Sequence, residues 1–416
     1  MSEYDLSIVV VTRNDNHGLN LNERTNRFLD SCDYMSQKHK VFIELIIVEW
    51  NPPSENESLS ELFSKRLKRN NYLDIKIITV PNELHNKFEN SKNLHLYQMI
   101  GKNVGIKRAN AKFVLATNID IIFNDGFFIK IKKGLKEKTL YRCYRLDVPQ
   151  DYAFIESPIE LLQKCKQNFH TINSRFGTFI FKNKFIRFLL NHSMTFNMRL
   201  RFLIIYCACQ TFLIFIFKMI CSPFTFIAMH IAIASKKFAI ITKSINFIEK
   251  KIKGTVFKNF FLNFKVKLKK SNLDFKVKVK NFYLDFKVKV KNFYLFTNAC
   301  GDFTLLDKNS WLKINGYLEW PIYSLHIDSF LLFQAYYNEL HFKNLASVVT
   351  FHIDHSIGSG FSLKGEKILL DKLAQRSIPV LSFDEYKKTV INIKNNKIKF
   401  NKNWGLSNKK LKVNYL

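Results

Sequence analysis

The 416-residue sequence lacks the features that mark a secreted, disulfide-stabilised protein. Its seven cysteines form no Cys-x-x-Cys pair, so we expect neither a disulfide framework nor a cysteine-based zinc site. Met1 is followed within a few residues by a strand-like apolar segment, and no signal-peptide pattern precedes it. These absences predict reduced thiols and a protein that works in the cytoplasm.

Acidic residues are also scarce. The chain has 34 Asp and Glu against 65 Lys and Arg, a net charge of +31. Residues 164–296 alone have 26 Lys and Arg against three acids, which places +23 there and leaves +8 elsewhere. Such a concentration attracts polyanions, either anionic lipid headgroups or nucleic acid. The alternative is a low-GC genome, which enriches Lys, Asn, Ile and the 41 Phe together.

The first 150 residues alternate between strand-like and helix-like segments. Short apolar runs rich in β-branched residues, at 6–12, 42–48, 75–80 and 112–117, predict buried parallel strands. Residues 98–109 predict a helix before the last of these strands. Strands that alternate with helices indicate an α/β fold, with a mainly parallel sheet covered by helices on both faces.

Residues 156–294 have a different character. Two apolar stretches of about 16 residues each fill most of 199–235, short of the roughly 20 that cross a bilayer. They predict interfacial helices or a membrane-embedded hairpin, with two core helices of a soluble subdomain as the alternative. Residues 262–294 hold one degraded and two identical copies of an eleven-residue repeat, LDFKVKVKNFY. We interpret the repeats as a tolerated insertion that touches lipid.

Polar residues follow three predicted strands where each strand ends. In an open parallel sheet these ends meet at one edge, where ligands bind. Each residue alone is more simply explained as a turn or a helix cap. Together they predict a binding site for a nucleoside diphosphate. The residues are Thr12, Arg13, Asn14, Glu49, Trp50, Asn118 and Asp120.

Several segments resemble family-2-type glycosyltransferases of the GT-A fold and a bacterial group of GT-A-like proteins. The similarity lies in SIVVVTRND, ELIIVEWNPP, KNVGIKRANAKFVL, ATNIDI, TNACGDFTL, HIDS and HIDHSIGSG. It covers about 1–155 and 295–365 and implies a GT-A domain interrupted by a long insertion. Residues 1–155 would form its nucleotide-sugar-binding half, 295–386 its acceptor-side half and 387–416 a Lys/Asn-rich tail.

The resemblance implies transfer of a sugar from a nucleotide-diphosphate donor to a hydroxyl, with inversion at the sugar carbon. Asp328 would remove the proton of the acceptor hydroxyl, with His326 as its neighbour or substitute. The alternative for Asp328 is a helix cap. Asn103 and Asp302 would join the donor site, and Trp50 would stack on a base or sugar.

A divalent cation, Mn²⁺ or Mg²⁺, is implied as cofactor. Asp120 would bind it through oxygen, with His352 and His355 as further ligands. The usual Asp-x-Asp motif reads Asn118-x-Asp120, so only one carboxylate remains. The alternative for both histidines is a structural role.

The implied partners are a nucleotide-sugar, a glycan or lipid-linked acceptor in surface glycan synthesis, and the anionic inner face of a membrane. Nucleic acid is not expected. Two other classes of function stay open. One is a catalytically silent GT-A-like module that binds a glycan or nucleotide, which Asn118 favours. The other is a polyanion-binding protein built on the Lys/Phe repeats.

Overall fold

A computed structural model describes residues 4–16, 18–66, 70–181, 196–220, 288, 291–292, 294–355 and 363–416. Nearly all of the repeats, most of the second apolar stretch and the last five residues of the HIDHSIGSG segment lie outside these residues. The chain divides into two units, Met1–Phe202 with Asn292–Leu416, and Leu203–Lys291. The first unit contains the sheet and is described next.

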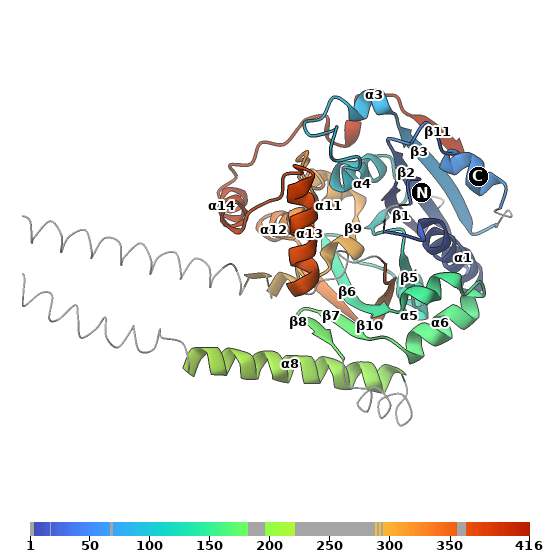
Figure 1. The fold of residues 1–416 in the computed structure, drawn as a ribbon. Coiled ribbons are helices and arrows are strands. Elements are labelled where there is room, and N and C mark those ends of the chain that lie inside the picture. Colours follow the sequence, from blue (N-terminus) through green and yellow to red (C-terminus); the bar gives the residue numbers. More distant parts are fainter. Residues whose placement is uncertain are drawn as a thin grey trace, which may run out of the picture. The chain divides into compact units, whose positions relative to one another are not determined.

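One mixed sheet runs through the first unit (Figure 1). Its strand order is β11-β3-β2-β1-β4-β9-β6-β10-β5, and β7 and β8 extend it from β6. The longest pairings, β1–β2, β2–β3 and β6–β10, are parallel. The strands are β1 (Leu6–Thr12), β2 (Ile43–Trp50), β3 (Leu73–Val80), β4 (Phe113–Ala116), β5 (Ile121–Phe123), β6 (Thr139–Val148), β7 (Thr171–Ser174), β8 (Gly177–Ile180), β9 (Thr304–Asp307), β10 (His341–Ile353) and β11 (Lys412–Tyr415).

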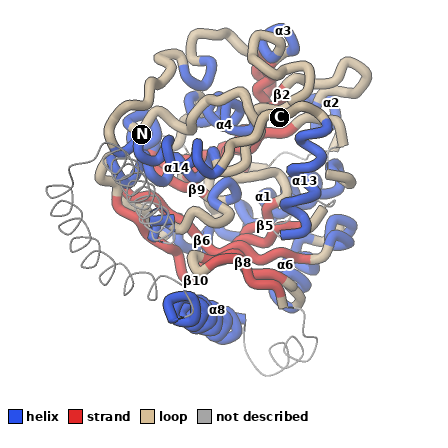
Figure 2. Tube along the Cα trace, turned by 60° about the vertical axis from the view of Figure 1, so that its left-hand side comes forward, coloured by secondary structure: helices blue, strands red, loops and turns tan. Residues whose placement is uncertain are grey.

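Helices flank this sheet, which is drawn in red in Figure 2. Helix α4 packs against β1, β2 and β4, and α1 packs against β3 and β5. The predicted α/β architecture is therefore confirmed. The helices are α1 (Leu21–His39), α2 (Leu59–Ser64), α3 (Asn82–His85), α4 (Gln98–Lys107), α5 (Asp125–Lys132), α6 (Pro158–Gln167), α8 (Phe196–Ile220), α11 (Lys308–Lys313), α12 (Ile327–Tyr337), α13 (Leu363–Gln375) and α14 (Phe383–Lys394), with 3-10 turns η1 (Gln150–Phe154), η2 (Cys300–Asp302) and η3 (Trp404–Leu406).

Segments from both ends of the chain build the same sheet. Strand β9 pairs antiparallel with β4, and β10 pairs parallel with β6 and antiparallel with β5. The β10–β6 register shifts between Asn344 and Val349 and then brings His352 opposite Asp147. Residues 1–155 and those after 294 thus contribute strands to one sheet.

Helix α8 covers the first of the two apolar stretches. Among the residues that the structure describes, no helix is both long and apolar enough to cross a membrane.

Two glycines let α4 approach β1 closely. A Cβ at Gly101 would lie 2.6 Å from Val11 Cγ1, and one at Gly105 would lie 2.4 Å from Val9 Cγ1. Both distances are too short for real carbon atoms, so the helix sits where only glycine fits. Because Lys102 and Asn103 lie on this helix, the same contact fixes their position.

Gly105→Ala should lower the free energy of unfolding by about 1–3 kcal/mol, because the added methyl overpacks the α4–β1 contact. Denaturant unfolding measures this loss. Val9→Ala in the same chain makes room for the methyl, so the double variant should lose less than the sum of the two single losses. Strictly additive losses would show that the two side chains do not meet.

Candidate functional site

A cleft of about 990 Å³ opens at the carboxyl ends of several strands. It is lined by residues that follow β1 and β4, by the last part of β6 and β10, and by the start of α12. One face of α13 also lines it. The charged and imidazole side chains in its wall are Asp15, Arg24, His95, Asp120, Arg145, Arg175, Asp302, His326, Asp328, His352, His355, Lys372 and Arg376.

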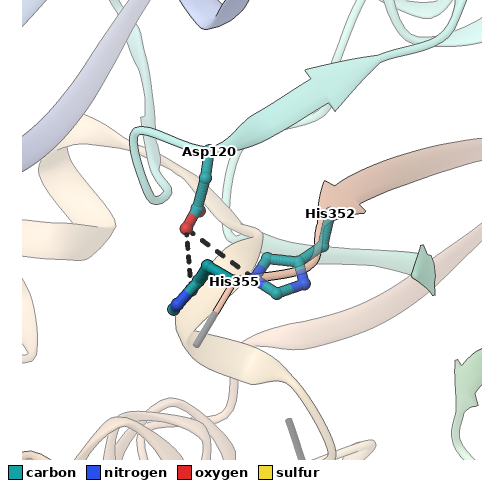
Figure 3. A group of neighbouring side chains, drawn as sticks. All are labelled: Asp120, His352 and His355. Carbon is teal, nitrogen blue, oxygen red and sulfur yellow. Dashed lines mark ion pairs between the residues drawn. The ribbon is translucent and has the colours of Figure 1, made fainter. Parts of the chain in front are cut away.

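The three predicted metal ligands lie together in this cleft (Figure 3). Asp120 Oδ2 is 3.2 Å from His355 Nε2 and 3.7 Å from His352 Nε2. One possible ligand atom from each residue lies within 4.8 Å of the other two, so the group could hold a metal ion. Asp120 Oδ1 is buried and makes no hydrogen bond to any described residue. A buried carboxylate oxygen of this kind fits a metal ligand.

Arg24 is a fourth member of the cluster. From the first turns of α1, its Nη1 lies 2.9 Å from Asp120 Oδ2, and its side chain is almost fully buried. Burial alone would raise the pKa of Asp120, but His352, His355 and Arg24 outweigh it and hold that pKa well below its usual range. Asp120 is therefore an anion, with the Arg24 guanidinium and two imidazole rings around it.

Gly18 allows this cluster to close. Its φ of +76° is in the left-handed region, and an added Cβ would lie 2.8 Å from His355 Nδ1 and 3.0 Å from Arg24 Nη2. The loop after β1 thus passes directly against two of the groups around Asp120.

Asn118 is held by hydrogen bonds on both sides of its amide. Its Nδ2 donates to Asp302 Oδ1 at 2.6 Å, and its Oδ1 accepts from Gln98 Nε2 at 2.9 Å and Lys102 Nζ at 2.8 Å. An aspartate at 118 would place two carboxylate oxygens in contact. Asparagine at 118 therefore has a structural reason, which is that this side chain donates to Asp302.

The side chains of Lys102 and Arg145 both contact the η2 turn. Lys102 Nζ donates to the carbonyl of Gly301 at 2.7 Å, and Arg145 pairs with both Asp302 and Asp147. Burial lowers the pKa of Lys102 to about 8, although Asp302 and other nearby carboxylates oppose the shift. The turn that carries Asp302 is thus tied to α4, β4 and β6.

Asp328 and His326 line the cleft at the start of α12. Ser329 N donates to Asp328 Oδ1 at 2.9 Å, so one carboxylate oxygen caps the local backbone. A Cβ on Gly301 would lie 2.9 Å from Asp328 Oδ2, which places that oxygen against the η2 turn. His326 is exposed, has a φ of 67°, and its ring lies 5.8 Å from the ring of Tyr386.

Two residues that the sequence predicts to bind the nucleotide-sugar lie in the core instead of the cleft. Trp50 is fully buried; its Nε1 donates to His85 Nδ1 at 2.9 Å and its ring packs against Tyr97. Glu49 accepts from the backbone of Leu59 at 2.8 Å, and burial raises its pKa. The prediction that Trp50 stacks on a ligand is corrected, because its indole has no exposed surface.

Four more predicted residues are outside the cleft wall. Asn103 is fully buried, and its side-chain amide forms two hydrogen bonds with the backbone of Tyr317, donating to the carbonyl and accepting from the N–H. Arg13 donates to Asn51 O, and Thr12 is buried. Asn14 Nδ2 donates to Glu57 O, and the Asn14 carbonyl accepts from Asn56 Nδ2. Asn118, Asp120, Asp302, His326, Asp328, His352 and His355 do line the cleft.

The sequence interpretation missed Arg145, Asp147 and Arg24. Arg145 and Asp147 carried a signal, because they are charged residues among the apolar ones of the segment TLYRCYRLDV, and buried charges need partners. Arg24 carried none, since its partner Asp120 is 96 residues away in sequence.

Comparison with known proteins finds no family model that matches the chain and no curated protein of similar sequence. The functional interpretation of the cleft therefore depends on its own geometry.

Asn118→Asp should lower the free energy of unfolding by about 1–3 kcal/mol, because it sets a carboxylate against Asp302. Thermal or denaturant unfolding measures the loss. Asn118→Asp combined with Asp302→Asn restores a donor between the two side chains and should recover part of it. A single variant as stable as the parent would contradict this network.

Proposed function

We propose that the protein is a GT-A-type glycosyltransferase that moves a sugar from a nucleotide-diphosphate donor to a hydroxyl. The observation that carries the proposal is one cleft that contains both a cluster able to hold a metal ion and a carboxylate on a separate element. The cluster is Asp120 with His352 and His355, and the carboxylate is Asp328. Transfer of a sugar from a nucleoside diphosphate needs charge neutralisation at the leaving diphosphate and a base at the acceptor hydroxyl.

Asp120, His352 and His355 would hold Mn²⁺ or Mg²⁺. When bound, the cation would offset the charge that develops on the leaving diphosphate. The wall of the cleft also carries the cationic side chains of Arg175, Lys372 and Arg376. These cations favour a ligand with several negative charges.

Asp328 would act as the general base. Asp328 lines the cleft; its Oδ2 lies beside Gly301, and its Oδ1 accepts from the backbone N–H of Ser329. As the acceptor oxygen bonds to the sugar carbon, the bond from that carbon to the diphosphate breaks, and the hydroxyl proton passes to Asp328. His326, exposed at the same helix start, would orient the acceptor.

A second candidate is a GT-A-like module that binds a nucleotide-sugar without transferring it. The observation that favours it is the ion pair of Arg24 with Asp120, which already satisfies one carboxylate oxygen. Donor turnover separates the two candidates, since a silent module shows neither transfer nor hydrolysis.

In this proposal the acceptor is a glycan precursor that is attached to a lipid carrier. The basic segment 164–296 would draw the protein to an anionic membrane surface, where each Lys or Arg gains about 1 kcal/mol. Helix α8 adds exposed apolar side chains at Met198, Phe202 and Ile205.

Asp120→Asn should remove Mn²⁺-dependent binding of a nucleotide-sugar, because it takes away the only carboxylate of the Asn-x-Asp motif. Calorimetry with and without Mn²⁺ measures this. Asp125→Asn is the matched control: Asp125 also lies within 3.1 Å of a histidine, His39, but it is not part of the cleft wall. Equal Mn²⁺ dependence in parent and Asp120→Asn would place the metal elsewhere.

Asp328→Asn should lower the rate constant for transfer by about 10²–10⁴ while donor binding stays within a few-fold of the parent. Steady-state kinetics gives the rate, and calorimetry gives the donor affinity. Equal losses in binding and rate would instead assign Asp328 a structural role at the start of α12.

A further inference from the structure

His352 lies between carboxylates on both sides of its ring. Its Nε2 is 3.7 Å from Asp120 Oδ2, and its Nδ1 is 3.5 Å from Asp147 Oδ1 and 3.7 Å from Asp354 Oδ1. The ring is nearly fully buried, and the ring of His355 lies 5.3 Å from it. One nitrogen therefore faces the candidate metal site and the other faces away from it.

The sheet itself sets this arrangement. His352 on β10 is the direct parallel partner of Asp147 on β6. Asp147 is fixed in turn by Arg145 Nε at 2.8 Å and by Asn173 Nδ2, which donates at 3.0 Å. Asp147 is thus held by two other side chains, those of Arg145 and Asn173.

Asp354 completes the second side of the ring. Its Oδ2 lies 3.1 Å from His170 Nε2, and its side chain is about one-third exposed. Asp147 and Asp354 together with His352 could themselves hold an ion. The guanidinium of Arg145, which already pairs with Asp147, opposes a second cation there.

We infer that Asp147, supported by Asp354, is a positioning residue that holds the His352 ring with Nε2 toward Asp120 and so sets the affinity of the cleft for a divalent cation. This rests on the metal site of the proposed function. In a neutral imidazole one nitrogen carries hydrogen and the other a lone pair. A carboxylate at Nδ1 keeps the hydrogen there and leaves the Nε2 lone pair for the metal, the role that outer carboxylates have at many metal sites.

The test titrates Mn²⁺ into the full-length chain by calorimetry, and follows Co²⁺ binding by visible absorption. Asp147→Ala should weaken Mn²⁺ binding by about 10–100-fold and change the Co²⁺ spectrum, because the ring is no longer held. Asp147→Asn should lose less, since its amide oxygen can still lie against Nδ1–H. Asp354→Asn, at a partly exposed position, should show a smaller loss in the same direction.

Asp125→Asn is again the control, because it removes a carboxylate beside a different histidine and should leave Mn²⁺ affinity unchanged. Parent-like affinity and Co²⁺ spectra in all three variants would overturn the inference while the metal site stands. A parent chain that binds neither ion would overturn the metal site and this inference together. Two ions per chain would make Asp147 a ligand and overturn its positioning role. If Asp147→Ala does not fold, Asp147→Asn and Asp354→Asn decide the question by the same criteria.

Discussion

The pairing of Arg145 with Asp302 joins the two parts of the chain that build the cleft. Arg145 comes from β6, in the first part, while Asp302 lies 157 residues later, just before β9. On one side Asp302 accepts from Asn118, and on the other Arg145 reaches Asp147, the neighbour of His352. A single guanidinium thus connects the η2 turn to the strand that carries a candidate metal ligand. The cleft can form only when the two distant segments are in the same sheet.

These contacts affect stability strongly because the charges in them are buried. An ion pair removed from water contributes little on balance, whereas removal of one partner leaves the other charge unpaired at a cost of about 3–5 kcal/mol. Arg24, Asp120 and Asp147 are nearly inaccessible, the Arg145 side chain is 11% exposed, and all four are paired. The cleft is consequently a coupled group of charges. Substitutions that preserve shape reveal function there more clearly than truncations do.

The sequence was informative where a local pattern determined the structure. Apolar runs located the first four strands, and the resemblance of the segments around Asp120, His352 and His355 pointed to the metal-capable cluster. Strand ends were a weaker guide, because a position at the sheet edge does not say which way a side chain points. Glu49 and Trp50 are adjacent at such an end and both are buried in the core. Long-range partners such as Arg24 depend on tertiary packing and left no local pattern.

The register shift between Asn344 and Val349 has a consequence for how this chain can change length over evolution. Side chains alternate along a strand, so one residue gained or lost after the shift would exchange His352 for Phe351 or Ile353 beside Asp147. The irregular stretch can absorb such a change only by altering its own bulge. We therefore expect homologous chains to vary in length in the surface loops and to keep a constant residue count from Val349 to His352.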